Sequence, residues 1–338
     1  MKNSGIGGQA VIEGVMMKNK SKYAVSVRVP DKSIQCEVKE YHSIIEKHKW
    51  LGLPFIRGTV NLVESMIVGT RTLSYSADFF EDEEPKKEGE KGFMSGWVMA
   101  LTMLFSFALA LFLFMFLPQF LSELLCKAFG LPIGGKVGAV IEGFCKIFIF
   151  VAYIVLITLM DDIKRTFMYH GAEHKSINCI EHGMPLNVEN VKKSSRFHKR
   201  CGTSFIIFVL LIAIIVHMFI PKISGFGKLV NFLLRFGIRI LLIPVIAGIS
   251  YEFLRIAGRK DNGFINFISK PGFLMQKLTT REPTDDMIEV AINSVEKVFD
   301  WRKFLKENFS VEVEYPEGWE NPEPEGEDCS SSGLCPQK

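Results

Sequence analysis

The sequence predicts a mainly α membrane protein with four transmembrane helices, a small N-terminal α+β cytoplasmic element and a C-terminal cytoplasmic helix. Two observations predict this class. The 338 residues are 48% hydrophobic and include 29 Phe, which is a rich content for a soluble chain. The apolar residues also gather in blocks of about 20 residues, the length at which a helix crosses a bilayer. These blocks are residues 94–118, 140–160, 204–221 and 236–254.

The four blocks differ in how strongly they predict a span. The first and third carry no Asp, Glu, Lys or Arg, so burial in the core of a soluble protein explains them poorly. The second contains Glu142 and Lys146, and the fourth contains Arg239 and Pro244. Charged residues and proline are unusual inside a span, so three spans are the alternative to four.

The distribution of Lys and Arg predicts the orientation. Residues 161–203 contain eight of them, against two in residues 119–139 and three in residues 222–235. Connections rich in Lys and Arg stay in the cytoplasm, so the segment 161–203 is predicted to be cytoplasmic. With four spans, the N and C termini lie on the same side of the cell (inner or plasma) membrane.

Charge and cysteine content narrow the expected partners. The net charge is +3, and the basic residues lie where membrane insertion needs them, so no nucleic-acid partner is expected. We expect the lipid bilayer and other membrane proteins as partners, with an unknown substrate. The seven Cys are an odd number, and six fall on the reducing side or within the bilayer, so no disulfide framework is predicted.

The chain divides into five regions by composition. The N-terminal region contains a predicted β-hairpin, in which YAVSVRV and IQCEVKEY flank the turn PDKS, and a helix from about Gly58. Thr284 is the predicted cap of a late helix. The regions are residues 1–80 (α+β, cytoplasmic), 81–93 (charged linker), 94–254 (transmembrane domain with the cytoplasmic His/Cys loop 161–203), 255–306 (cytoplasmic or interfacial helices) and 307–338 (disordered acidic tail).

The window FMYHGAEHKSINCIEHG, residues 167–183, contains the pattern H-x-x-E-H. On a helix, His170 and His174 are four residues apart and point the same way, with Glu173 close to that face. Two neutral imidazoles so placed can chelate a divalent metal, most simply zinc, and the carboxylate can take a proton from water. The window therefore predicts a metallohydrolase site with Glu173 as the catalytic base, and an exposed polar turn without metal is the competing explanation.

The third metal ligand is open to more than one assignment. Glu252 ends the last apolar block at the predicted cytoplasmic face and is the candidate, although an ion pair with Arg255 explains it equally well. A different arrangement pairs C-x-x-H with H-x-x-C in a closed structural zinc site that performs no chemistry. Its ligands would be Cys179, His182, His198 and Cys201.

The N-terminal stretch Gly7-Gly8-Gln9 followed by Glu13 has two interpretations. Gln9 and Glu13 could complete a polar site, with the glycines allowing close approach of a ligand. A strand that begins with a glycine bulge needs no ligand, and this simpler interpretation is preferred.

Six segments of the chain carry a resemblance to a known family: GIGGQAVIEGVMMK, RGTVNLVES, YHGAEHKSINCIE, ENVKKSSRFHKRCGTSF, SYEFLRIAGR and QKLTTREP. They resemble the bacterial integral-membrane family DUF1385, also called the YqhQ-like family, from Gly5 to about Phe304. The resemblance implies a predicted metal-dependent enzyme whose gene often lies near translation-termination genes. It draws attention to Gln9, Glu13, His170, Glu173, His174, Cys179, His198, Cys201 and Glu252.

Three function classes follow from these patterns. A membrane-embedded metal-dependent hydrolase explains H-x-x-E-H together with Glu252. A zinc-stapled structural or adaptor membrane protein explains the Cys and His pairs without catalysis. A transporter comes third, because its expected ionisable residues lie mostly near the ends of the apolar blocks.

Overall fold

The computed structural model describes the chain except for residues 81–92, 134, 221–224, 226, 260–262 and 323–338. The chain forms two compact units, each assembled from separate stretches. The first contains residues 1–80, 157–205 and 247–338, and the second contains residues 81–156 and 206–246. These units do not follow the sequential regions expected above, because the N-terminal, central and C-terminal segments fold together.

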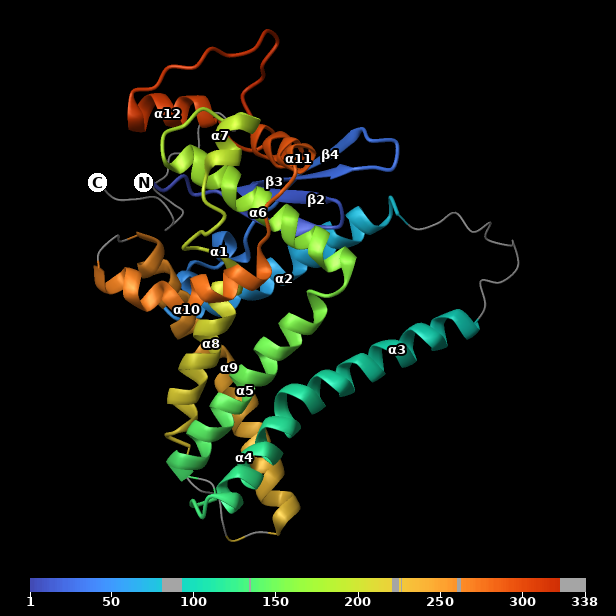
Figure 1. The fold of residues 1–338 in the computed structure, drawn as a ribbon, viewed down its shortest axis with the longest axis vertical. Coiled ribbons are helices and arrows are strands. Elements are labelled where there is room, and N and C mark those ends of the chain that lie inside the picture. The colour runs from blue at the N-terminus through green and yellow to red at the C-terminus, as the bar shows by residue number, and fades with distance from the viewer. Residues whose placement is uncertain (81–92, 134, 221–224, 226, 260–262, 323–338) are drawn as a thin grey trace. The chain divides into compact units, whose positions relative to one another are not determined.

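The first unit is built on a four-stranded antiparallel sheet in which neighbouring strands are consecutive in the chain (Figure 1). The strands are β1 (Gly7–Val11), β2 (Gly14–Asn19), β3 (Lys22–Arg28) and β4 (Ile34–Glu40). The predicted hairpin is present as β3 and β4, with Ala24 opposite Val38. The glycine-led start of the chain adds a second hairpin.

The sheet is buried on both faces because its apolar residues alternate. Val15, Met17 and Ala24 belong to one hydrophobic core, which they share with helices α6 (Asp161–Glu181) and α11 (Asp285–Glu296). Met16 and Val25 belong to the core of the opposite face, where Val68 of α2 (Ile56–Ala77) packs. The remaining helices that lie wholly in this unit are α1 (Ile44–Lys47), η1 (Lys49–Gly52), α7 (Val188–Lys193), α10 (Gly263–Thr279) and α12 (Trp301–Phe309).

The central segment differs from the expected cytoplasmic loop. It forms α6 and α7, and Tyr169, Ile177 and Ile180 of α6 are fully buried in the core beside the sheet. Helical spacing places these apolar residues on the face that meets the strands, while the polar residues between them meet other parts of the chain. A segment whose sequence is largely polar therefore forms the central helix of its unit.

The C-terminal segment also departs from the expectation of one helix followed by a disordered tail. The helix after Thr284 ends at Glu296, and α12 starts after Asp300, whose side chain accepts a hydrogen bond from the Lys303 N–H at 3.0 Å. The Tyr315 hydroxyl donates to Asp300 at 3.1 Å. The expected tail thus contacts the unit in its described part, whereas most of the charged linker and residues 323–338 lie outside the described residues.

The second unit holds the long apolar helices. They are α3 (Phe93–Leu111), the π-helical turn η2 (Phe112–Phe116), α4 (Leu117–Ala128), α5 (Gly135–Ile157) and the larger parts of α8 (Gly202–His217) and α9 (Lys228–Arg259). Large apolar side chains on them are exposed, among them Phe105 and Phe148. Such surfaces are typical of helices that contact lipid.

Three helices, not clearly the expected four, are long and apolar enough to cross a membrane among the described residues. They are Leu101–Ala128, Gly135–Ile157 and Leu233–Gly258. The block 204–221 forms the apolar helix α8, but this helix has only 16 residues and ends at His217. At 1.5 Å per residue it reaches about 24 Å, short of the about 30 Å of a hydrocarbon core.

Gly171 of α6 supplies a test of the packing in the first unit. A Cβ atom at this position would meet the backbone carbonyl oxygen of Arg281, which cannot move as a flexible side chain can. We predict that Gly171→Ala lowers the free energy of unfolding by about 1–3 kcal/mol, as overpacking does. Gly263→Ala is the matched control, since its added Cβ would meet no described atom within 4 Å apart from its chain neighbours and its own helix backbone. Equal unfolding temperatures for the two variants in detergent would contradict this packing.

Candidate metal centre

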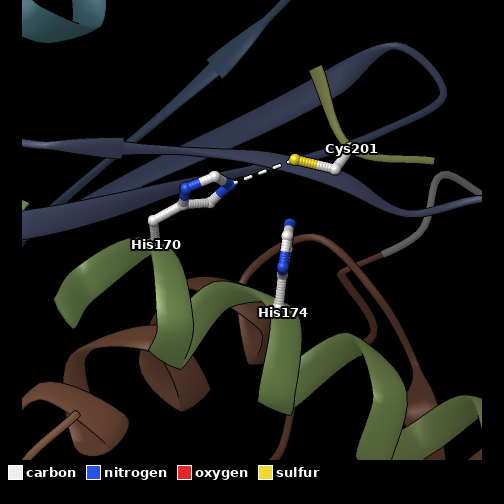
Figure 2. Close-up of side chains that lie close together, drawn as sticks. All are labelled: His170, His174 and Cys201. Carbon is white, nitrogen blue, oxygen red and sulfur yellow. Dashed lines mark hydrogen bonds between the residues drawn. The ribbon is translucent and has the colours of Figure 1, made fainter. Parts of the chain in front are cut away.

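Helix α6 brings His170 and His174 together. They are one turn apart on its surface, and their ring centroids are 4.4 Å apart. Figure 2 shows both imidazoles projecting from the helix toward the same space. The predicted i, i+4 arrangement of the two histidines is therefore present.

Cys201 is the third member of this cluster. It immediately precedes α8, and its Sγ lies 3.4 Å from His170 Nε2 (Figure 2). One potential ligand atom from each of His170, His174 and Cys201 lies within 4.8 Å of the other two. The sequence assigned Cys201 to the alternative zinc site, whereas the structure places it with the two histidines of H-x-x-E-H.

Backbone carbonyls orient both imidazoles. His170 Nδ1 donates to the Thr279 carbonyl at 2.8 Å, and His174 Nδ1 donates to the Arg196 carbonyl at 2.6 Å. With the Nδ1 proton held in this way, a neutral imidazole has its lone pair on Nε2. Metal-binding histidines are oriented by the same kind of hydrogen bond.

Two amide side chains hold the segment that carries Cys201. Asn178 of α6 donates to the carbonyls of Ser195 and Phe197 at 2.7 and 2.9 Å. Gln276 of α10 donates to the His198 carbonyl at 2.8 Å and accepts from the His198 N–H at 2.9 Å. Sequence reasoning missed both amides, and no motif marks them, because their partners are backbone groups far away in the chain.

The cluster favours a deprotonated sulfur. Burial alone raises the pKa of Cys201, but the two neighbouring imidazoles outweigh burial and bring that pKa well below its usual value. Burial lowers the pKa of His170, but the Cys201 thiolate and the Glu173 carboxylate outweigh it and raise the pKa to about 9. Without a metal, this buried pair is best described as a thiolate facing an imidazolium.

The donors fit a zinc-like ion. Two imidazole nitrogens and one thiolate are borderline-soft ligands, and three protein ligands leave one of the four tetrahedral positions open. The ligand atoms also come from two segments that are fixed by hydrogen bonds, so the site is preorganised. A divalent cation could take the place of the proton that His170 otherwise binds.

Glu173 lies beside the cluster but outside the set of ligand atoms. Its carboxylate is 3.9 Å from His170 Nε2, and its side chain is 7% exposed. Burial raises its pKa. A Cβ on Gly8 would lie 2.7 Å from Glu173 Cγ, so this glycine of β1 leaves the room that the carboxylate occupies.

The comparisons with known proteins identify the family. The family model "Protein of unknown function (DUF1385)" matches residues 53–301, which include all of α6 and Cys201. The chain belongs to the DUF1385 family. It is 34% identical over 319 residues to "Uncharacterized protein YqhQ" of Bacillus subtilis (strain 168), covering 89% of this chain and 94% of that protein. No solved structure matches it significantly.

In this DUF1385 chain, Glu252 is engaged elsewhere. Arg57 donates to both of its carboxylate oxygens at 2.6 Å, and Arg255 lies 3.8 Å away, as the competing ion-pair explanation expected. A carboxylate satisfied by two guanidinium groups is a structural ion pair, so Glu252 does not join His170 and His174. Arg57 is 195 residues from Glu252, and no sequence spacing points to it.

The residues of the alternative zinc site are not brought together. The Cys179 thiol donates to the Pro185 carbonyl at 3.5 Å, and burial raises its pKa to about 11, which disfavours a metal-binding thiolate. His182 Nδ1 donates to the Asn178 carbonyl at 2.7 Å. His198 lies 3.4 Å from Glu181, so only Cys201 of that set belongs to the cluster.

Gln9 and Glu13 have structural partners in this fold. The Gln9 amide lies where a Cβ on Gly69 of α2 would stand, so the side chain of this β1 residue packs against that helix. Glu13 occupies the turn after β1 with φ 48, and Arg165 donates to both of its carboxylate oxygens at 2.5 Å. Among the described residues, no hydrogen bond or ion pair joins Gln9 or Glu13 to the two histidines.

Glu181 anchors a buried network beside the cluster, in which the His198 ring centroid lies 5.7 Å from that of His174. It accepts hydrogen bonds from the Ser4 N–H and hydroxyl at 2.8 Å and from Arg200, and it lies 3.4 Å from His198. Burial raises the pKa of Glu181, but the His198 hydrogen bond and the Arg200 charge outweigh it and lower the pKa to about 2. This network ties the N-terminus and the residues before Cys201 to the end of α6.

The low pKa of Glu181 makes a pH-dependent prediction. Because the folded pKa is below the unfolded value of about 4.3, its stabilisation is present above about pH 4.5 and is lost as the pH falls toward 2. We predict that Glu181→Gln lowers the free energy of unfolding by about 3 kcal/mol at pH 7. The difference from wild type should shrink in unfolding experiments below about pH 4.

The control for this prediction is Glu189→Gln. Glu189 is exposed and pairs only with Lys193 one turn away on α7, so its loss should leave unfolding almost unchanged at every pH. A wild-type advantage over Glu181→Gln that stays constant from pH 7 to pH 3 would refute the assigned charge of Glu181.

Proposed function

We propose that this protein is a membrane-bound, metal-dependent enzyme with hydrolase-like chemistry, and that His170, His174 and Cys201 hold its divalent ion. One observation carries the proposal. Two imidazoles whose Nδ1 atoms are tied to carbonyls converge with a sulfur on one small buried space. Without a metal, a proton on His170 Nε2 faces the Cys201 sulfur there, and a divalent cation could take its place.

Zinc is the ion that these donors suit best. Cys sulfur and His nitrogen are the ligands of most tetrahedral zinc sites, and a site with three protein ligands is the kind that performs chemistry. When bound there, the ion would act as a Lewis acid and make an attacking water more acidic.

Glu173 is the proposed proton carrier. Its buried carboxylate lies next to the ligand cluster without belonging to it, and its raised pKa brings it closer to neutral pH. It would take the proton of the attacking water and then deliver that proton to the leaving group. Gly8 has no side chain, so it leaves room for this carboxylate.

A structural metal site without catalysis is the second candidate function. The observation in its favour is burial, since His174 is 1% and Cys201 is 4% exposed. An ion held there would staple α6 to the segment before α8 and would draw on its binding free energy to stabilise the fold. The chain would then be an adaptor in the membrane.

The proposed location is the cytoplasmic face of the inner membrane, and both termini would share that side because they fold in the same unit as residues 161–203. The basic residues of 161–203 support this orientation. Helix α10, which orients His170 through Thr279, exposes Phe264, Phe267 and Leu274. An apolar helix face next to the site suits a peptide or lipid-linked substrate at the bilayer surface.

Metal content is the first test. We predict about one zinc per chain in the detergent-purified wild type and a loss of most of it in His174→Ala and Cys201→Ser, measured by inductively coupled plasma mass spectrometry. Glu252→Gln and Cys179→Ala are matched controls that should keep the metal, because neither residue reaches the cluster. Retention of zinc by Cys201→Ser with its loss from Cys179→Ala would point to the alternative ligand set.

Glu173→Gln separates catalysis from a structural role. We predict that this variant keeps its metal and its level in the membrane, since Gln has the same shape and residue 173 is not a ligand. It should nevertheless fail to restore any phenotype of gene loss. Complementation is measured beside Cys201→Ser, which should fail through lost metal. Full complementation by Glu173→Gln at a normal protein level would end the enzyme proposal and favour the structural one.

A further inference from the structure

A second polar cluster lies among the candidate spans of the second unit, independent of the metal centre. Glu142 and Lys146 are one turn apart on α5, with Lys146 Nζ 2.9 Å from Glu142 Oε1. Arg239 of α9 donates to Glu142 Oε2 at 2.6 Å. Three ionisable side chains from two apolar helices therefore meet in one place.

The cluster lies farther inside its helices than the apolar blocks of the sequence indicated, because α5 and α9 begin before those blocks. Glu142 follows the start of α5 at Gly135 by about two turns, or about 10 Å along the helix. Arg239 lies a similar length inside the candidate span that begins at Leu233. Ionisable groups at such a depth are rare, face protein or a polar cavity, and mark ligand or ion sites.

The charges of the cluster do not balance. One carboxylate, Glu142, faces two cations, Lys146 and Arg239, so the three groups together carry one excess positive charge when ionised. The nearby Glu123 and Arg235 cancel each other in a formal count. Apolar helices supply no counter-charge, and water is scarce at this depth.

A cavity opens beside the unbalanced charge. It has a volume of about 70 Å³, and its lining includes two guanidinium groups, Arg235 and Arg239, and two carboxylates, Glu123 and Glu142. His217, Ser122 and Gln119 add polar side chains to the lining. One water occupies about 30 Å³ in the liquid, so the cavity can admit the head of a group such as phosphate or carboxylate. The positive excess therefore comes from Lys146, which pairs with Glu142 one turn away on α5 and lies outside the lining.

We infer that this cavity binds one small anion, a phosphate group, through Arg239 and the excess positive charge of the cluster. A guanidinium presents parallel donors that match phosphate oxygens, and it stays ionised at any working pH. Two sources offer this chemistry: the head group of an anionic phospholipid in the surrounding leaflet, and inorganic phosphate from solution. Glu142 holds the two cations in position and limits the affinity through its own negative charge.

The test uses the full chain in two settings. In neutral detergent, inorganic phosphate is titrated at constant ionic strength and the melting temperature is followed. In nanodiscs of phosphatidylcholine with increasing phosphatidylglycerol, retained lipid is counted by native mass spectrometry. A response to phosphate alone assigns the site to the free anion, and a response to phosphatidylglycerol assigns it to the lipid head group.

Two variants should change the anion affinity in opposite directions, and a third is the control. Arg239→Gln should weaken anion binding by about tenfold or more, and Glu142→Gln should strengthen it, because it removes the competing negative charge. Lys127→Gln is the control: it removes an exposed positive charge from α4 that does not line the cavity and should change nothing.

The opposite signs keep the inference falsifiable even when one variant folds poorly. If Glu142→Gln weakens binding as Arg239→Gln does, the cluster is a structural ion pair only and the inference fails. Anion binding that is equal in wild type, Arg239→Gln and Lys127→Gln overturns it as well, and so does the absence of binding in both settings.

Discussion

The first unit depends on the burial of one polar helix. Helix α6 is buried over its C-terminal half, yet that half is rich in ionisable and amide side chains, each of which needs a partner once water is excluded. The partners are largely backbone groups of the segments that pack around the helix. The hydrogen bonds that the α6 side chains need therefore fix the path of the chain from Ser194 to Cys201 and from Thr279 to Glu282. The side chains concerned are His170, His174, Lys175, Asn178 and Glu181.

This constraint explains which parts of the site were predictable. The spacing of His170 and His174 is local, because a helix sets it within one turn, and the hairpin of β3 and β4 follows from alternation and a turn. Cys201 is not local. It reaches His170 only because Asn178 and Gln276 hold the preceding backbone, and the pairing of a side-chain amide with a distant peptide group leaves no pattern in the sequence. The ion pair of Glu252 with Arg57 was equally hidden, since the two residues lie 195 positions apart in the chain.

For the fold, too, the composition of the sequence predicted some features, and the topology of the chain determined others. The apolar blocks located three candidate spans, because length and hydropathy alone decide whether a helix can cross a bilayer. Composition did not reveal that residues from the N-terminus, the centre and the C-terminus share one core, in which Val15, Ile177 and Ile288 meet. Local patterns show which face of an element is apolar, but the choice of partner depends on contacts far apart in the chain.

Glu173 gives the strongest physical reason to connect this helix with chemistry. A buried carboxylate is costly unless cations or donors compensate it, and the groups that favour the charge of Glu173 are His174 and His170, the latter at 3.9 Å. His170, His174 and Cys201 supply three ligands, whereas a structural zinc site has four protein ligands, so the role of Glu173 decides whether the fourth position is closed or left open. A bound cation would lower the cost of the charge, and the carboxylate would then stand beside the open position of the ion. An acid–base group is useful in that place, because it can exchange a proton with a water bound at the open position.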